Sequence, residues 1–300
     1  MLKIAYHAIF KHPLPEGHRF PMEKYELLPK QLLHEGSCTE ANFFEPEMPE
    51  EAAILAVHDE NYFRSLQDLS LDKRAERKIG FPLSEALVSR EQIIADGTIK
   101  ASEFALQYGI AMNIAGGTHH AYTNHGEAFC LLNDQAIAAR YLQKNKLAKK
   151  ILIVDLDVHQ GNGTAEIFAN DDSVFTFSIH GRNNYPFKKE HSDLDIAMPD
   201  GTGDKEYLKI LKDTLPKLIE QQQPNFIFYL SGVDILSTDK LGKLGCTPEG
   251  CKERDRFVLQ LLKNSKIPVE VSMGGGYSPD IKTIIEAHAN TYRMAQEIYF

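Results

Sequence analysis

The chain has 300 residues, 43% of them hydrophobic, which allows one α/β domain with a large buried core. Its formal net charge of −9 at pH 7 argues against direct nucleic-acid binding, which needs a basic surface. The amino terminus lacks a signal peptide, no apolar run approaches the ~18 residues of a membrane span, and the four cysteines are scattered, so we expect a cytoplasmic protein with free thiols and no membrane contact.

Helical and strand patterns alternate along the first half of the chain. Helices are predicted where apolar residues recur at helical spacing, and strands where apolar residues form short runs. In chain order we expect a strand at 2–6, a helix at 22–35, a strand at 41–44, a helix at 49–69, a helix at 84–108 interrupted at Gly97, and a strand at 110–117. The proline-rich segment 10–22 is expected to be a loop.

The second half continues the alternation. We expect a helix at 133–145 capped by Asn133 or Asp134, a strand at 151–154, a helix at 164–169, a strand at 174–179, a helix at 204–221, a strand at 226–230, a helix at 248–264, a strand at 269–273 and a helix at 278–299. Thr247 is expected to be the N-cap of the helix at 248–264, and Pro248 its first residue. No linker or repeat divides the chain, so the pattern predicts a single domain, residues 1–300, with a parallel sheet covered on both faces.

The segment 151–163, I-L-I-V-D-L-D-V-H-Q-G-N-G, combines a buried strand with metal-ligand residue types. If the chain stays extended, Asp155, Asp157 and His159 point the same way, about 6–7 Å apart. Carboxylates and an imidazole that converge at the end of a strand suit a divalent cation such as zinc. Polar residues that merely end a strand are the structural alternative.

Other strand ends also carry chemically active side chains. His119 and His120 follow the strand at 110, Asp234 follows the strand at 226, and Tyr277 follows the last strand. Each alone also fits a surface turn, a helix cap or a flexible loop. Because ligand sites of parallel sheets lie at the carboxyl ends of the strands, their repeated placement there predicts one shared site.

Five segments in this order resemble the histone deacetylase superfamily: G-G-T-H-H-A, E-A-F-C-L-L-N-D, D-L-D-V-H-Q-G-N-G, S-G-V-D-I-L-S-T-D-K-L-G and G-G-G-Y. The resemblance covers nearly the whole chain and is greatest to the class IV branch and its bacterial relatives. It implies the arginase/deacetylase fold, a single α/β domain around an eight-stranded parallel sheet. It also implies zinc-dependent hydrolysis of an acylated lysine or a related acylated amine.

The resemblance implies three metal ligands, Asp157, His159 and Asp234. Three protein ligands leave a position open for water, as a catalytic zinc site requires. Zinc is the implied ion, with ferrous iron as the alternative. A second, monovalent-cation site, usually for potassium, is implied at Asp155 and Ser178, completed by the backbone carbonyls of Asp157, His159 and Ile179.

The resemblance also assigns catalytic roles. His119 would pair with Asp155, and His120 would be the general base that takes the water proton and later gives it to the leaving amine. Tyr277 would donate its hydroxyl to the carbonyl oxygen of the substrate. Asn162 stands where many members of the family have aspartate, so His120 is expected to be neutral more readily than His119.

A narrow channel for the lysine methylenes is implied as well. Phe129 and Phe187 would line it, Leu241 would lie near its rim, and the glycines around Gly275 would keep its wall thin and leave Tyr277 mobile. Arg19 resembles the arginine at the foot of the channel, although a surface arginine in a proline-rich loop fits equally. The acidic rim residue of several relatives has no counterpart in F-P-L-S-E-A-L-V.

Two other functions were weighed. A two-metal ureohydrolase of the same fold needs a D-x-H-x-D run and a D-x-D pair, whereas this chain has D-x-D-x-H and a single aspartate in S-G-V-D. A non-catalytic acyl-lysine-binding module is expected to lack the ligands or the tyrosine, both of which are present here.

Overall fold

The computed structural model describes all 300 residues, and its centre is one sheet of eight parallel strands. The strand order is β2-β1-β3-β8-β7-β4-β5-β6. The strands are β1 (Lys3–Ala5), β2 (Phe43–Phe44), β3 (Ile110–Asn113), β4 (Ile151–Asp155), β5 (Val174–Gly181), β6 (Leu194–Met198), β7 (Phe226–Leu230) and β8 (Val269–Ser272). The predicted α/β architecture with an eight-stranded parallel sheet is confirmed.

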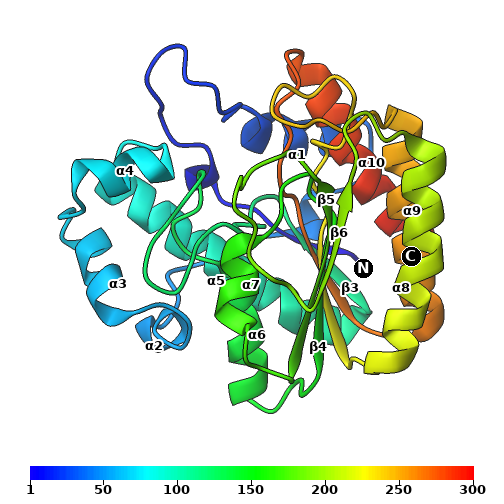
Figure 1. The fold of residues 1–300 in the computed structure, drawn as a ribbon, viewed down its shortest axis with the longest axis horizontal. Coiled ribbons are helices and arrows are strands. Elements are labelled where there is room, and N and C mark those ends of the chain that lie inside the picture. Colours follow the sequence, from blue (N-terminus) through cyan, green and yellow to red (C-terminus); the bar gives the residue numbers. More distant parts are fainter.

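Helices cover both faces of this sheet (Figure 1). They are α1 (Lys24–His34), α2 (Glu51–Ile54), α3 (Glu60–Gln67), α4 (Lys73–Ile79), α5 (Glu85–Tyr108), α6 (Asp134–Lys144), α7 (Asn162–Phe168), α8 (Asp204–Gln222), α9 (Pro248–Ser265) and α10 (Ile281–Tyr299). Helices α5, α6 and α7 lie on one side, α1, α8, α9 and α10 on the other, and α2 to α4 project beyond the sheet. None of these helices combines the length and the apolar character that crossing a membrane requires.

The core follows from the apolar runs of the central strands. Every residue of β4, β7 and β8 is buried, as expected for parallel strands covered on both faces. The helix caps follow local sequence too, because the Asn133 side chain accepts from the Ala136 amide and the Thr247 side chain accepts from the Gly250 amide. Both predicted N-caps are confirmed.

Several predicted boundaries are wrong. Helix α5 runs without a break through Gly97, where a Cβ would lie 2.9 Å from Asn113 Nδ2, so the glycine serves close packing of helix on sheet. The single helix predicted at 49–69 is two short helices, and Asp59 caps the second. Helix α10 begins at Ile281 behind Asp280, a few residues later than predicted. Strand β6 and helix α4 were not predicted, because neither has a sustained apolar pattern.

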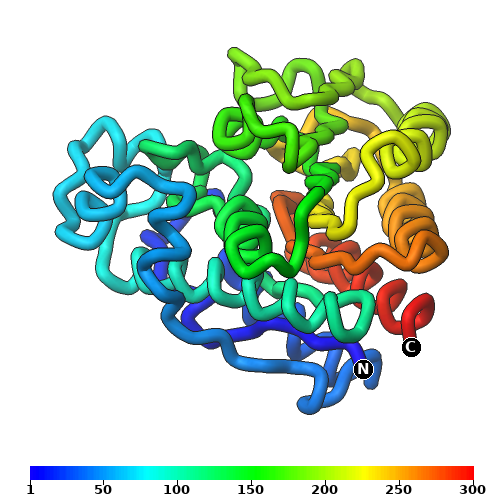
Figure 2. Tube along the Cα trace, turned by 90° about the horizontal axis from the view of Figure 1, so that it is seen from below, coloured from blue at the N-terminus to red at the C-terminus, as the bar shows by residue number.

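Strand order brings distant segments to one edge of the sheet. β7 lies between β4 and β8, and β3 pairs with β8 on its other side. The loops that follow β3, β4, β7 and β8 therefore meet although they are far apart in sequence. Figure 2, seen from below, shows early and late segments of the chain side by side, as at the blue amino-terminal and red carboxy-terminal segments. In both views the two chain ends also lie close together. The predicted metal ligands, His119, His120 and Tyr277 belong to these four loops, whereas Arg19 follows β1, Phe187 follows β5, and Ser178 and Ile179 lie within β5.

Candidate active site

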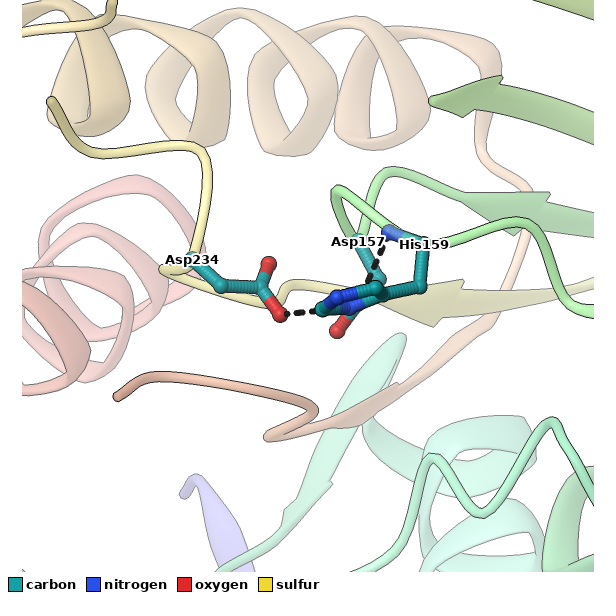
Figure 3. Close-up of side chains that lie close together, drawn as sticks. All are labelled: Asp157, His159 and Asp234. Atoms are coloured by element: carbon teal, nitrogen blue, oxygen red, sulfur yellow. Dashed lines mark hydrogen bonds and ion pairs between the residues drawn. The ribbon is translucent and has the colours of Figure 1, made fainter. Parts of the chain in front are cut away.

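Two aspartates and a histidine form a buried cluster at the carboxyl edge of the sheet. Asp157 and His159 follow β4, and Asp234 comes from the loop after β7 (Figure 3). One donor atom of each lies within 4.8 Å of the others. His159 Nδ1 is 3.0 Å from Asp157 Oδ1 and 3.3 Å from Asp234 Oδ2. The structure thus brings together the three residues predicted as metal ligands.

Asp155 does not join this cluster. Strand β4 ends at Asp155 and the chain turns at 157–159, so the extended backbone that was assumed for the whole D-x-D-x-H run is wrong. The turn directs Asp155 to His119 and leaves Asp157 and His159 facing Asp234. Ser178 lies beside Asp155 in the β4–β5 register, and its hydroxyl contacts His180 Nδ1 at 3.0 Å. The monovalent-cation site there remains a prediction, with Ile179 as the next residue of β5.

Backbone amides hold the carboxylates in place. Val158 N donates to Asp234 Oδ1 at 2.9 Å, and Gly275 N donates to Asp157 Oδ2 at 2.9 Å. Asp234 Oδ2 is buried and has no hydrogen-bond donor, although it points at the His159 ring. A buried carboxylate oxygen without a donor is unusual and is satisfied when a cation takes the donor's place.

The donor set and its spacing fit a small divalent cation. Tetrahedral zinc with ligand distances of about 2.0–2.1 Å keeps neighbouring ligand atoms roughly 3.3 Å apart, close to the separations seen here. Burial lowers the pKa of His159, but Asp157 and Asp234 outweigh burial and raise it to about 10. Burial and the neighbouring Asp157 raise the pKa of Asp234 to about 7. Both shifts reflect negative charge concentrated in a dry pocket, which a cation would neutralise.

Arg254 on α9 ties the two ligand-bearing loops together. Its side chain is fully buried, and its guanidinium donates to the carbonyls of Gly232 at 2.6 Å, Ser231 at 3.1 Å and Leu156 at 3.3 Å. Asp255 accepts from Arg254 Nε at 2.9 Å. One planar side chain therefore fixes the backbone next to Asp157 and Asp234. Sequence reasoning missed it because nothing in a helical pattern marks a buried arginine.

Two neighbouring histidines have unlike partners. His119 Nδ1 lies 2.7 Å from Asp155 Oδ2, and His120 Nδ1 lies 2.6 Å from Asn162 Oδ1, so both predicted contacts are confirmed. Burial lowers the pKa of His119, but Asp155 outweighs it and the net shift is upward. Burial and the nearby His119 and His159 rings hold the pKa of His120 well below its usual range. The directions of the two shifts agree with the predicted order of the pKa values, which stays a prediction.

The buried carboxylate of Glu127 contacts Asn162 on the side of the amide that faces away from His120. The Asn162 amide nitrogen donates to Glu127 Oε2 at 3.2 Å and to the Tyr122 hydroxyl at 3.0 Å. Glu127 also lies 3.2 Å from His125 Nε2, forms an ion pair with Lys78 and accepts from Tyr185. Burial raises the pKa of Glu127, but these three partners, His125 first, outweigh it and lower the pKa to about 2. Because the amide nitrogen faces Glu127, the amide oxygen must face His120. Glu127 was not predicted as a site residue, although it belongs to the E-A-F-C motif.

Tyr277 and the glycines before it close the other side of the cluster. A Cβ on Gly275 would lie 2.0 Å from Asp234 Oδ2, and one on Gly274, whose φ is +70°, would lie 2.6 Å from Leu230 Cδ2. Gly275 is therefore required by the close approach of the backbone to the carboxylates, and Gly274 by its positive φ and its contact with Leu230. The expected mobility of Tyr277 stays a prediction. Tyr277 N is fixed by Asp239 Oδ2 at 2.6 Å, and its ring lines the cavity above His159.

A channel leads from the surface to the cluster. Its outer part, about 1120 Å³ including the open mouth, reaches His120 and His159. Phe129 and Leu241 line it as predicted, and Tyr185, whose ring meets the His120 ring edge-on at 5.1 Å, was missed. An inner cavity continues past Gly275 and Tyr277.

Two channel predictions are wrong in position. Phe187 is 90% exposed and stands at the mouth, not in the narrow part. Arg19 is also exposed at the mouth, with its guanidinium 5.0 Å from the Phe129 ring, and does not lie at the foot. The buried cations of the inner cavity are Arg90 and Lys24, whose ammonium donates to Gly274 O at 3.0 Å. Burial lowers the pKa of Lys24 to about 8.

Comparisons with known proteins find similar sequences and similar folds over most of the chain. The family model described as "Histone deacetylase domain" matches residues 18–292. An uncharacterized protein of Picosynechococcus is 43% identical over 99% of both chains. Histone deacetylase 2 of Arabidopsis thaliana is 28% identical over 89% of this chain and 72% of its own length. A crystal structure of an HDAC homolog from Aquifex aeolicus superposes with a TM-score of 0.85 at 24% identity, covering 98% of this chain and 84% of that one. An HDAC homolog complexed with SAHA gives 0.86, also at 24% identity, covering 99% and 84%.

Proposed function

Because the chain belongs to the histone deacetylase family, we propose that it is a metal-dependent amidohydrolase that removes acetyl or longer acyl groups from acylated lysine or a related amine. The observation that carries the proposal is the buried Asp157, His159 and Asp234 cluster at the bottom of a channel. His120 and Tyr277 border the same channel. These groups supply a metal site, a base and a hydroxyl donor around one channel.

Zn²⁺, or Fe²⁺ as the alternative, would be held by Asp157, His159 and Asp234 and would act as a Lewis acid at this point. His120 is neutral near pH 7 because its pKa is low, so its free nitrogen can accept the proton of the attacking water. The same ring then donates that proton to the departing amine nitrogen. His119 is held by Asp155 and contributes positive charge. Tyr277 donates its hydroxyl to the carbonyl oxygen as negative charge develops there.

Substrate contacts follow from the channel walls. The flat rings of Phe129 and Tyr185 suit the methylenes of a lysine side chain, and Leu241 extends this apolar wall toward the mouth. We further propose a potassium ion beside Asp155 and Ser178, which are adjacent in the sheet. The four buried free cysteines fit action in a reducing compartment such as the cytoplasm.

One experiment separates this proposal from its alternatives. Purified protein loaded with zinc is incubated with an acetyl-lysine peptide, and metal per chain and released acetate are both measured. We expect one zinc per chain and steady release of acetate, both lost in Asp234→Ala. Two metal ions per chain with urea release from a guanidino substrate would favour a ureohydrolase instead. Peptide binding without acetate release at full metal loading would favour a non-catalytic module.

A further inference from the structure

The mouth of the channel is positively charged in a protein that is acidic overall. Three exposed cations line the outer cavity, namely Arg19, Lys78 and Lys243, and no aspartate or glutamate lines it. The whole chain carries a formal charge of −9. Positive charge gathered around the opening of a channel creates a local positive potential there, and this potential attracts anionic ligands although the protein as a whole is negative.

Two of these three cations have no carboxylate partner. Arg19 makes its close contact with the Phe129 ring, at 5.0 Å, and forms no ion pair. The Lys243 ammonium forms neither an ion pair nor a hydrogen bond, whereas its backbone is held on both sides: its amide donates to Asn184 Oδ1 at 3.2 Å and its carbonyl accepts from Gly201 N at 2.7 Å. Lys78 is paired with Glu127, whose carboxylate is buried behind the channel wall. The charge presented to an incoming substrate is therefore positive.

The rim that carries Lys243 is held in place. Asn184 Nδ2 donates to Leu241 O at 2.7 Å, which joins the loop after β5 to the loop after β7. Lys189 donates to Asn184 O at 2.7 Å and braces the same loop from the side, adding another cation nearby. Because the two loops are tied together, the cationic positions keep a fixed relation to the channel axis.

We propose that this rim selects acylated amines whose neighbouring groups are anionic, such as carboxylates, over substrates flanked by lysine or arginine. The proposal rests on the deacylase function proposed above and names its substrate class. A substrate seated in the channel would bring its flanking groups to Arg19 and Lys243, where anions are attracted and cations repelled. Two sources share this chemistry: an acidic peptide and a small acylated amino acid with a free carboxylate.

The test compares three acetyl-lysine peptides that differ only in flanking residues, with two Glu, two Gln or two Lys. We expect kcat/KM to fall in that order, with a Glu-to-Lys ratio on the order of tenfold at low ionic strength. The ratio should shrink toward one in 1 M salt, where charges are screened beyond about 3 Å. Nε-acetyllysine and its carboxamide, compared in the same assay, distinguish a small anionic substrate from an acidic peptide.

The second part of the test reverses one charge at the rim and repeats the comparison of the three peptides. Lys243→Glu should lower the Glu-to-Lys ratio at least about fivefold, because one attraction becomes a repulsion. Lys149→Glu, at an exposed lysine just before the amino end of β4 and so on the opposite edge of the sheet, should leave the ratio unchanged. Equal rates for all three peptides, or a ratio unaffected by Lys243→Glu, would overturn the proposal while leaving deacylation intact. If no peptide releases acetate, deacylation fails, and equal binding affinities of the three peptides would then reject the rim proposal separately.

Discussion

At the scale of single residues, Asn162 and Glu127 act as a pair. A carboxylate at position 162 would face the Glu127 carboxylate across the 3.2 Å now spanned by an amide hydrogen bond, and two like charges at that distance repel. Asparagine instead donates to Glu127 and presents its oxygen to His120. The negative charge nearest to Asn162 is therefore that of Glu127, which lies behind the amide and does not contact His120 directly.

Exchanging the two groups should change the pH dependence of the reaction. In Asn162→Asp combined with Glu127→Gln, the carboxylate lies directly against His120 Nδ1, favours the imidazolium and raises the pKa of His120. Since the base must be neutral, the acidic limb of kcat/KM should move to higher pH. Glu127→Gln alone should leave that limb in place or move it to lower pH. A limb at the wild-type pH in the double variant, with full metal content, would contradict the assignment of His120 as base.

Tyr277 should act on the chemical step alone. The residue lines the channel, while its backbone amide is held by Asp239, so Tyr277→Phe removes a hydroxyl without disturbing the loop. We expect unchanged zinc content and a fall in kcat of roughly 10²-fold or more, the usual effect of losing one oxyanion donor. Steady-state kinetics with metal analysis checks this, and a kcat within twofold of wild type would refute the role.

At the scale of elements, helix α9 braces the loops after β4 and β7 from behind. Arg254 reaches three carbonyls of these loops, and Asp255 is held in turn by Tyr229 of β7 and by Thr291 of α10, the latter at 2.7 Å. Strand, loop and helix are therefore connected through one buried network. A metal site built on two separate loops depends on this bracing, because its ligands must keep a fixed separation.

Weakening the brace should weaken metal binding without touching a ligand. Arg254→Lys keeps the charge, but a single ammonium cannot reach the carbonyls of Leu156, Ser231 and Gly232 together. We expect zinc affinity, measured by competition with a chelator, to fall about 10–100-fold and the melting temperature to fall as well. Arg256→Lys is the matched control, because Arg256 lies on the same helix in exposed ion pairs. Equal zinc affinity in the two variants would show that Arg254 serves stability alone.

At the scale of the whole molecule, the cluster couples metal binding to folding. Asp157 and Asp234 are buried side by side, and burial together with Asp157 raises the pKa of Asp234 to about 7. Above that pH both carboxylates are charged in the native state without a cation, and only the His159 imidazolium, whose pKa they raise to about 10, offsets them. The stability that this proton contributes is lost as the pH rises from the unfolded pKa of histidine toward 10, so the native state without metal becomes less stable relative to the unfolded chain. A cation that binds only the native state offsets this destabilisation.

Removing metal should therefore lower the melting temperature, more at pH 8 than at pH 5.5. Zinc at a hundredfold excess over its dissociation constant adds about 2.7 kcal/mol, enough for a shift of several degrees in a chain of this size. Calorimetry with and without chelator at the two pH values measures the effect. Asp234→Asn should make the apo protein less sensitive to pH over this range. A melting temperature that is independent of metal at both pH values would exclude ions from the cluster.

Local sequence was enough to determine the alternation of strands and helices, the caps at Asn133 and Thr247, and the placement of active side chains at strand ends. Each of these depends on neighbours within a few residues, through side-chain periodicity or a capping hydrogen bond. The five motifs of the family resemblance also identified Asp157, His159 and Asp234 as the residues of the cluster. The errors at Gly97 and in the region 49–69 arose where packing against the sheet, rather than local preference, decides whether a helix continues.

Only the tertiary structure decided how the site is assembled. Asp234 reaches Asp157 because β7 lies beside β4 in the sheet, a pairing that no local pattern encodes. The hydrogen bond from Asn162 to Glu127 and the clamp formed by Arg254 likewise join segments 35 and up to 98 residues apart. Arg19 and Phe187 carry the right chemistry for a channel, but the course of their loops sets them at its mouth. Long-range contacts of this kind depend on how the whole sheet is ordered, which is why residue type and spacing alone could not supply them.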